Sequence, residues 1–349
     1  MNTAADMNAV PLRVGVLYPR EWNGDFDADL DRLRAIGPRV EVLAASYSEP
    51  QESRSGRGVP PYDHLRELAP ELTAEHLSVF GQIDCCIAID LPFDVRSIAP
   101  NLRWVQGVGA GIAQLWSAGL EDAGIRLTNG SGVTSTAIAE FVMARILGEF
   151  KQVRLLDERQ QQARWEPVFG QEIAGKTLGL IGLGPINEAV AARARAFGLR
   201  VVALRRSGAP SDLVDDVVGP DALHDMLGQS NIVVAAVPES PETDRMMDAA
   251  AFAAMRTGAM FVNVGRGTLV DEDALVDTLE ARHLRAAAID VARIEPLAPT
   301  SRLWTAPNLY ISAHCSTDPT SLFRNLHRLF EDNVRRFLDG EPLRNEVRP

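Results

Sequence analysis

The sequence predicts an α/β protein that folds as two similar domains, each built on a parallel sheet. Its 349 residues exceed the roughly 250–300 residues over which a single hydrophobic core keeps growing. Short apolar runs alternate with helical stretches in two successive series, which is typical of parallel strands joined by crossover helices. In the second series one apolar run leads directly into a glycine-rich turn and a helix. Length, alternation and this turn together predict the fold class.

The first series predicts five short strands and three helices. A polar, Gly- and Pro-rich segment, Ser48–Pro61, interrupts the series and predicts a mobile loop. The predicted strands are Leu12–Leu17, Arg39–Ala45, Asp84–Asp90, Arg103–Val108 and Arg126–Asn129. The predicted helices are Asp27–Ala35, Leu72–Phe80 and Gly111–Ala118.

A long helical pattern, Thr134–Trp165, separates the two series and ends before Pro167. A helix of this length bridges domains or packs at a dimer interface. A solvated helix explains its charged second half, Lys151–Arg164, at least as well.

The second series consists of continuous apolar runs, as expected for strands that are buried on both faces. An amphipathic helix, Ser321–Leu338, closes the chain. The predicted strands are Thr177–Gly182, Arg200–Leu204, Asn231–Val237, Met260–Val264, Ala286–Val291 and Leu309–Ser312.

Composition excludes several classes of protein. A net charge of −12 argues against nucleic acid or an anionic membrane as a partner. No apolar run reaches the ~18–20 residues of a membrane span, and Met1–Pro11 lacks the basic and apolar segments of a signal peptide. Three cysteines (Cys85, Cys86 and Cys315) form neither a closed disulfide framework nor a zinc motif. We therefore expect a cytoplasmic protein without a bound metal.

The glycine-rich turn predicts a dinucleotide site. Gly182 and Gly184 follow the strand of residues 177–181, and Pro185, Ile186 and Asn187 open the next helix. Glycines at such a turn let the backbone approach a pyrophosphate, which then lies on the helix N-terminus. A Gly-x-Gly alone is weak evidence, and the strand–turn–helix context is what favours binding over a plain turn.

Two departures from the usual dinucleotide-binding pattern at this turn predict somewhat altered contacts with the ligand. Asn187 stands where the third glycine normally permits close packing of helix on strand, and Pro185 removes one amide that could meet phosphate.

The next strand ends on residues that decide the type of dinucleotide. NAD-binding folds place an acid there for the ribose hydroxyls, whereas this chain has Arg205, Arg206 and Ser207. Two guanidinium groups and a hydroxyl suit a 2′-phosphate, so NADP(H) is favoured over NAD(H). A solvated pair of surface arginines is the alternative.

Three later segments place reactive side chains just after predicted strands. Arg266, Glu295 and His314 lie beyond strand ends, where a parallel sheet forms its ligand crevice. Together they suit carbonyl reduction. Arg266 can bind a carboxylate and polarise a 2-oxo group, and His314 can protonate the oxygen. Glu295 can orient the imidazole and favour its protonated form. Singly, each residue also reads as a surface arginine, a helix-entry charge or a buried histidine.

At this point the chain resembles the D-isomer-specific 2-hydroxyacid dehydrogenase family over nearly all residues beyond Asn101. The most specific pattern is Asn-x-x-Arg-Gly-x-x-Val-Asp, which starts at Asn263, followed by Asp-Val-x-x-x-Glu-Pro-Leu from Asp290. Other matching segments are Gly109–Ile112, Gly175–Gly179, the Gly182 turn and Phe330–Asn345.

The resemblance implies roles for individual residues. Arg266, Glu295 and His314 match the catalytic arginine, glutamate and histidine, and Ala110 and Gly111 match the amides that hold the substrate carboxylate. The remaining assignments to the cofactor are Val237, Val264 and Asp290.

The resemblance also implies an architecture. It implies two Rossmann-like domains, one flavodoxin-like and one dinucleotide-binding, with a cleft between them. Residues 1–131 and 318–349 are then expected to bind substrate, and residues 132–317 to bind NAD(P). A homodimer that uses the long helices is expected. Pocket walls are expected near Leu91–Phe93, Trp104 and Trp304.

Within the family the chain is most similar to the glyoxylate/hydroxypyruvate reductase branch, on the basis of its Gly-Ala-Gly segment and its arginine pair. Ala113, Ala292 and Ala313 depart from the common pattern. Ala113 is expected to affect local hydrogen bonding rather than chemistry, whereas Ala292 and Ala313 could widen the pocket and leave the substrate side chain open. Two other hypotheses remain. One is a dinucleotide-sensing binding protein of the corepressor type, and the other is a formate- or phosphite-oxidising dehydrogenase.

Overall fold

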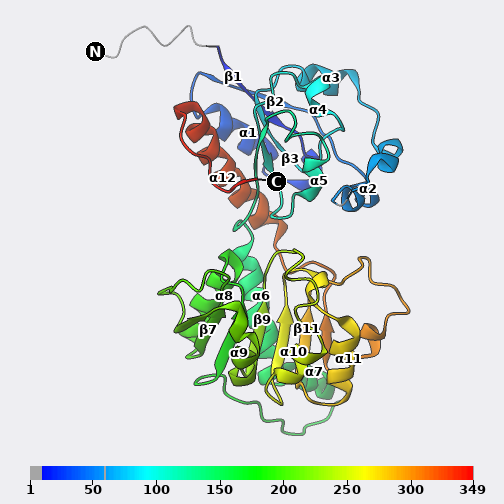
Figure 1. Ribbon diagram of the computed structural model, residues 1–349, viewed down its shortest axis with the longest axis vertical. Coiled ribbons are helices and arrows are strands. Elements are labelled where there is room, and N and C mark those ends of the chain that lie inside the picture. The colour runs from blue at the N-terminus through cyan, green and yellow to red at the C-terminus, as the bar shows by residue number, and fades with distance from the viewer. Residues whose placement is uncertain (1–9, 59, 349) are drawn as a thin grey trace. The chain divides into compact units, whose positions relative to one another are not determined.

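The computed structural model describes residues 10–58 and 60–348 and divides into two compact units (Figure 1). Unit 1 comprises the chain up to Val133 together with the segment from Pro319 onward, and unit 2 is Thr134–Asp318. Each unit is a sheet with helices on both faces, wholly parallel in unit 2 and parallel except for one edge strand in unit 1, so the predicted α/β class is confirmed. Most of the segment Met1–Pro11 lies outside the described residues.

In unit 1 the strand order is β13-β5-β4-β3-β1-β2. All neighbours pair in parallel except β13, which runs antiparallel to β5. The strands are β1 (Leu12–Val16), β2 (Val40–Ala44), β3 (Cys85–Ala88), β4 (Trp104–Gly107), β5 (Arg126–Thr128) and β13 (Glu346–Val347). The α-helices are α1 (Phe26–Arg34), α2 (Gln51–Gly56), α3 (Ala74–Phe80), α4 (Val95–Ile98), α5 (Ala113–Trp116) and α12 (Pro319–Asp339).

Alternate side chains of each unit 1 strand enter opposite cores, as the period of two in a strand requires. Cys85 and Ile87 pack with α1 and α12 on one face. Cys86 and Ala88 pack with α3, α4 and α5 on the other. Both faces are apolar, which explains the unbroken hydrophobic runs in the sequence.

In unit 2 the strand order is β12-β11-β10-β9-β6-β7-β8, all parallel. Its strands are β6 (Thr177–Ile181), β7 (Arg200–Leu204), β8 (Asp216–Val218), β9 (Ile232–Ala235), β10 (Met260–Asn263), β11 (Ala286–Ile289) and β12 (Leu309–Ile311). Its α-helices are α6 (Ser135–Phe150), α7 (Val153–Gln161), α8 (Pro185–Ala196), α9 (Leu223–Gln229), α10 (Ala249–Ala254) and α11 (Glu272–Glu280).

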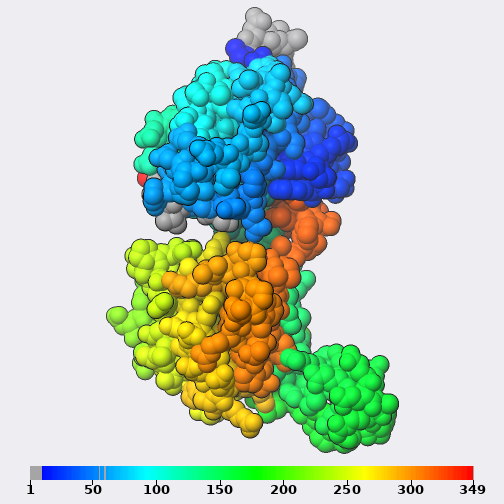
Figure 2. Space-filling model, turned by 90° about the vertical axis from the view of Figure 1, so that its right-hand side faces the viewer, coloured from blue at the N-terminus to red at the C-terminus, as the bar shows by residue number. Residues whose placement is uncertain are grey.

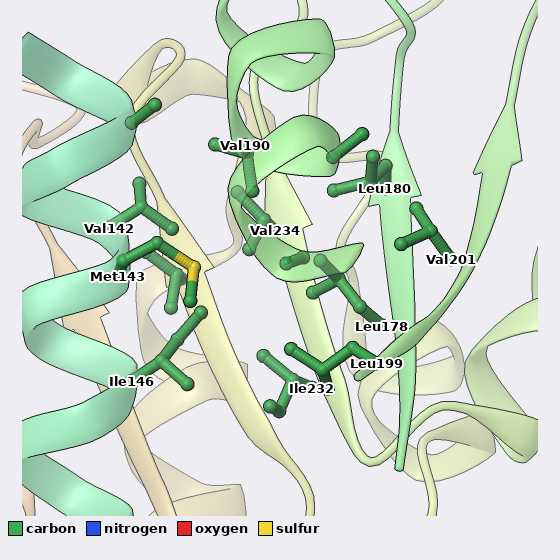
Figure 3. Close-up of a cluster of buried hydrophobic side chains, with 14 of the residues drawn as sticks. Val142, Met143, Ile146, Leu178, Leu180, Val190, Leu199, Val201, Ile232 and Val234 are labelled. Carbon is green, nitrogen blue, oxygen red and sulfur yellow. The ribbon is translucent and has the colours of Figure 1, made fainter. Parts of the chain in front are cut away.

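Helices α6 and α8 cover one face of the unit 2 sheet (Figure 3). Val142, Met143 and Ile146 of α6 point toward Val190 of α8 and the strand residue Val234. Helices α9, α10 and α11 cover the opposite face. The turn from β6 into α8 is therefore held between two packed elements.

Two predictions about local structure were wrong. The predicted single helix over residues 134–165 is two helices, because Gln152 between α6 and α7 has a φ of 59°, which lies in the left-handed region. The predicted mobile loop at residues 48–61 contains α2, where Arg57 pairs with Glu49 and Arg54 pairs with Asp90 at 2.7 Å. The first pair lies within the segment and the second reaches Asp90 after β3, and composition alone does not show which charged residues pair.

Connections shorter than an α-helix also contribute ordered structure. Short 3-10 helices lie at Arg20–Trp22, Asp63–Leu68, Pro220–Ala222, Gly267–Leu269 and Arg302–Thr305. None of the helices in the described part of the chain is both long enough and apolar enough to cross a membrane.

Candidate active site

The turn between β6 and α8 has the geometry of a phosphate-binding turn. Gly182 has a φ of 86°, and a Cβ there would lie 2.5 Å from Cγ1 of Val237. Gly184 caps α8, and among the described residues no heavy atom other than those of Gly184 and its chain neighbours lies within 4 Å of the position that its Cβ would occupy. Pro185 is the first helical residue, and its missing N–H costs no hydrogen bond at that position. Open backbone at the N-terminus of a twelve-residue helix fits the pyrophosphate of a dinucleotide.

Asn187 ties the helix to this turn in place of the usual third glycine. Its side chain is fully buried, and Nδ2 donates to the carbonyl oxygens of Ile181 at 3.0 Å and Gly182 at 2.8 Å. A glycine at this position achieves close packing by having no side chain, whereas Asn187 achieves it by binding the turn directly. Ile186 is half-buried against the α6 core.

The arginine pair lies directly beyond β7. Arg205 is half-buried and its N–H donates to Val218 O at 2.9 Å, while Arg206 and Ser207 are exposed. The Arg206 guanidinium lies 4.0 Å from Glu242 Oε2, a separation with a small energetic effect at the surface. The first residue after the strand is thus basic, and no carboxylate occupies the position of the usual ribose acid.

Arg266 lies in the turn that follows β10, and Asn263 shapes that turn. Asn263 is fully buried; its Oδ1 accepts from the Gly265 N–H at 3.0 Å, and its Nδ2 donates to Arg266 O at 3.0 Å. The Arg266 side chain is partly exposed and donates to Gly265 O at 2.8 Å. Its guanidinium therefore retains donors for a ligand.

His314 and Glu295 form a hydrogen-bonded pair. His314 Nδ1 lies 2.9 Å from Glu295 Oε2, and the other carboxylate oxygen accepts from the Ala292 N–H at 3.0 Å. The imidazole is about half exposed, at 54%, and the carboxylate is 34% exposed. Since Nδ1 faces the carboxylate, Nε2 is the ring nitrogen left for a substrate.

Asp290 organises the loop that carries His314. The buried Asp290 carboxylate accepts from Ser312 Oγ at 2.7 Å, from Cys315 N–H at 3.0 Å, and from Ser316 N–H at 3.2 Å and Oγ at 2.5 Å. The His314 N–H donates to Asp290 O at 2.7 Å. His314 itself has a φ of 52°, which is unfavourable for a residue with a side chain, and this network holds it there.

The Arg266 and His314 turns are joined at their bases. The Asp290 N–H donates to Asn263 O at 2.9 Å. Gly267 packs so closely on the next turn that a Cβ there would lie 2.0 Å from the Ala292 carbonyl carbon. Unit 2 therefore brings the three predicted catalytic residues to one edge of its sheet.

Val237 and Val264 occupy different positions at this edge. Val237 is half-buried against the Gly182 turn, whereas Val264 is buried in the core between the sheet, α6 and α8. Within the described residues, no group of three or more His, Cys, Asp and Glu side chains is arranged to hold a metal ion.

Unit 1 presents two free amides at the end of β4. The Gly109 carbonyl accepts from the Gly130 N–H at 2.7 Å, and the Ala110 carbonyl accepts from Asn129 Nδ2 at 3.1 Å. In a trans peptide the N–H points opposite to the C=O, so the Ala110 and Gly111 amides both face away from the 129–130 loop. Ala110 and Gly111 are exposed, and neither amide meets a protein acceptor in residues 10–58 and 60–348.

Sequence reasoning missed the residues that build these turns. Asn129, Asn263 and Ser316 carry no reactive group, so reasoning from chemistry gave them no role, although Asn263 opens the most specific pattern shared with the family. An asparagine or a serine next to a strand end was the available hint, since such side chains bind nearby backbone. The expected pocket wall at Trp104 was wrong, because its indole is fully buried and donates to Thr128 Oγ1 at 2.9 Å.

Comparison with known proteins gives a consistent result. Residues 143–316 match the family model described as the D-isomer specific 2-hydroxyacid dehydrogenase, NAD binding domain. A glyoxylate reductase of Aeropyrum pernix is 31% identical over 293 residues, which cover 81% of this chain and 84% of the relative. A glyoxylate/hydroxypyruvate reductase B of Klebsiella pneumoniae is 30% identical over 293 residues, which cover 82% of this chain and 91% of the relative.

A solved structure supports the same relationship. A D-isomer specific 2-hydroxyacid dehydrogenase from Xanthobacter autotrophicus, crystallised with NADPH and MES, has a TM-score of 0.74 and 27% identity. The match covers 96% of this chain and 98% of the other. The resemblance noted in the sequence is confirmed, including its placement in the glyoxylate reductase branch. The chain therefore belongs to the D-isomer-specific 2-hydroxyacid dehydrogenase family and is an NAD(P)-dependent oxidoreductase of that family.

Proposed function

We propose that the protein reduces a small 2-oxo acid of the glyoxylate or hydroxypyruvate type to the D-2-hydroxy acid, with NADPH as the preferred cofactor. The hydrogen-bonded pair of His314 and Glu295 carries the proposal, because a pure binding protein has no use for an oriented acid at a strand end. The relatives named glyoxylate reductase and glyoxylate/hydroxypyruvate reductase support the substrate class.

In this reaction each side chain has a separate task. Arg266 binds the substrate carboxylate and polarises the 2-oxo group, and the amides of Ala110 and Gly111 bind the same carboxylate. His314 Nε2 gives its proton to the carbonyl oxygen, and Glu295 stabilises the imidazolium and fixes the ring through Nδ1. When bound, the nicotinamide supplies the hydride.

The decisive test replaces His314, the proposed proton donor. In His314→Ala we expect kcat/KM for the oxo acid to fall on the order of 10²–10⁴-fold, with NADPH affinity and thermal midpoint retained. Glu295→Gln keeps the shape but not the charge, so we expect a smaller loss in kcat. His224→Ala, an exposed histidine on α9, is the matched control. Retained turnover in His314→Ala would refute the assigned role.

The NADPH preference rests on Arg205, Arg206 and Ser207 beyond β7. Each charge-assisted hydrogen bond to a 2′-phosphate is worth about 1.5–3 kcal/mol. Replacing both arginines by alanine should therefore raise KM for NADPH by tenfold or more and change KM for NADH little. Parallel increases for both cofactors would show that the arginines are only surface charges. The solved relative with bound NADPH supports the choice.

The same spectrophotometric assay of NAD(P)H tests the two other hypotheses. A dinucleotide sensor would bind NADPH tightly and turn over no oxo acid. A formate- or phosphite-oxidising enzyme would instead reduce NAD⁺ or NADP⁺ with those anions. We favour the reductase over the sensor because the chain keeps the hydrogen-bonded pair of His314 and Glu295.

We further propose a homodimer that forms through an arm at residues 151–170. The arm stands away from the rest of unit 2 as the green lobe in Figure 2. Trp165 is 102% exposed and Phe169 is 88% exposed, and such apolar surface marks an interaction site. Its root is fixed, since the Gln171 N–H donates to Phe150 O at 2.7 Å. Light scattering should show a dimer for the native chain and a monomer for Trp165→Ser with Phe169→Ser.

A cytoplasmic location also remains a proposal. Cys85 and Cys86 are buried, Cys315 is exposed, and all three are free thiols within the described structure. An exposed free thiol fits a reducing compartment. Fractionation with an antibody to the native chain tests this location directly.

A further inference from the structure

We infer that the C-terminal segment Arg344–Glu346 is a positioning element for the substrate site, and that Asn345 and Asn129 hold the amides of Ala110 and Gly111 outward. The inference rests on the proposed role of those amides in binding a carboxylate. It gives a positioning role to a segment that lies far from Ala110 and Gly111 in the sequence.

Each residue of the segment is anchored on a different part of unit 1. Fully buried Asn333 of α12 binds both backbone groups of Arg344, with Nδ2 3.1 Å from its carbonyl oxygen and Oδ1 2.8 Å from its nitrogen. Glu346 forms a two-bond ion pair with Arg126 of β5, at 2.7 and 2.8 Å. Asn345 lies between these anchors with a φ of 55°, a conformation that asparagine accepts better than most residues.

Asn345 fixes the loop that follows β5. Its Nδ2 donates to Ser131 O at 2.8 Å and Asn129 O at 3.3 Å, and its carbonyl accepts from the Asn129 N–H at 3.1 Å. The Asn129 side chain is held as well, because its Oδ1 accepts from the Ser131 N–H at 3.0 Å. With Oδ1 engaged, Nδ2 is oriented toward Ala110.

The loop after β5 then orients the peptides of the substrate loop. Asn129 Nδ2 donates a hydrogen bond to the Ala110 carbonyl, and the Gly130 N–H donates one to the Gly109 carbonyl. Gly130 must lack a side chain for this approach, since a Cβ there would lie 2.4 Å from Val108 O. Two successive carbonyls bound on one side leave two successive N–H groups on the other. Paired amides of this kind form an anion-binding concavity.

The test weakens the segment without disturbing its backbone. Asn345→Gly keeps the left-handed conformation but loses the side-chain amide, and Asn129→Ala removes the hold on Ala110. Asn308→Gly is the matched control, because Asn308 has a φ of 54° and donates to Arg285 O at 3.1 Å in unit 2.

Two measurements separate the inference from the proposed function. Hydrogen exchange should speed about tenfold or more at the Asn129 and Gly130 N–H groups in Asn345→Gly, because their acceptors are loosened. KM for the oxo acid should rise roughly tenfold in Asn345→Gly and Asn129→Ala, with kcat and the Kd for NADPH within about twofold. The control should change none of these quantities.

The outcomes are distinct. Unchanged exchange at Asn129 and Gly130 overturns the inference, whatever the kinetics show. Faster exchange with unchanged KM supports the positioning of the loop and overturns the carboxylate-binding role proposed for Ala110 and Gly111. Faster exchange with a raised KM for the oxo acid alone supports both.

Discussion

Acidification should destabilise unit 1 through one buried histidine, His327 on α12. Its side chain is fully buried, and burial lowers the pKa of the imidazole from 6.5 to about 4, with a further contribution from the charge of Arg32. Tyr18 OH lies 2.6 Å from Nε2, and Asn23 Nδ2 lies 2.9 Å from the same hydroxyl. The tyrosine stays protonated, since burial raises its pKa to about 12, so it donates to a neutral imidazole.

Asp29 is the carboxylate that would favour a charged imidazole. Its Oδ2 lies 3.5 Å from His327 Nε2. That carboxylate is already neutralised by Arg32 and accepts from Asn23 Nδ2 at 2.7 Å. We therefore expect burial to dominate and the imidazole to remain neutral in the folded chain.

The magnitude follows from linkage. Because the folded pKa lies below the unfolded one, the unfolded chain binds the proton first. The contribution to stability is therefore complete above pH 6.5 and is lost as pH falls toward 4. One pKa unit corresponds to about 1.36 kcal/mol, so the full loss is about 3 kcal/mol. About 2 kcal/mol of it should appear between pH 7 and pH 5.

Urea unfolding at pH 7, 6 and 5 measures this loss, followed by tryptophan fluorescence in a Trp165→Phe, Trp304→Phe background, in which all the remaining tryptophans belong to unit 1. His327→Gln keeps a hydrogen-bond acceptor for Tyr18 but does not titrate, so its stability should change less with pH by about 2 kcal/mol. His224→Gln, on the surface of unit 2, should follow the native chain. Equal pH dependence in the native chain and in His327→Gln would refute the reasoning.

Three further predictions concern the turns of unit 2. Gly267→Ala should reduce kcat/KM at least tenfold, measured by NADPH oxidation, because its Cβ would force the Arg266 turn away from Ala292; native-like activity would show that the turns move apart freely. Asp290→Asn places an amide against N–H donors of the His314 loop, so kcat should fall tenfold or more with NADPH affinity kept. A loss of NADPH affinity alone would instead make Asp290 a cofactor ligand. Asn187→Ala should lower the thermal midpoint and raise the Kd for NADPH severalfold by calorimetry, and an unchanged Kd would mean that the turn holds its own shape.

The sequence predicts the strands of this fold well because both sheets are buried on both faces. Residues such as Leu178, Val234 and Val262 belong to unbroken apolar runs, and the strand boundaries agree within a few residues. The short strands β8 and β13 escape this reasoning. Each lies at a sheet edge, where half-exposed residues give a weak hydrophobic signal.

The placement of the reactive side chains was also predictable, whereas the contacts that hold them in place were not. Arg266, Glu295 and His314 have reactive side chains at strand ends, and position in a parallel sheet implies that such residues converge. The backbone conformation of His314 and the hold of Asn345 on the loop after β5 depend on contacts between segments far apart in the chain. No local pattern encodes such contacts.

The division of the chain into two units has a consequence for how the enzyme diversifies. The phosphate-binding turn, the arginine pair and the acid pair all lie within one continuous stretch, Thr134–Asp318, while the two free amides lie in the other unit. On the roles proposed above, substitutions around Gly109–Gly111 and the chain terminus change the affinity for the carboxylate that all 2-oxo acids share, without touching the residues assigned to the cofactor and to proton transfer. Proteins with this architecture can therefore tune substrate affinity and the reduction step through substitutions in different units of the chain.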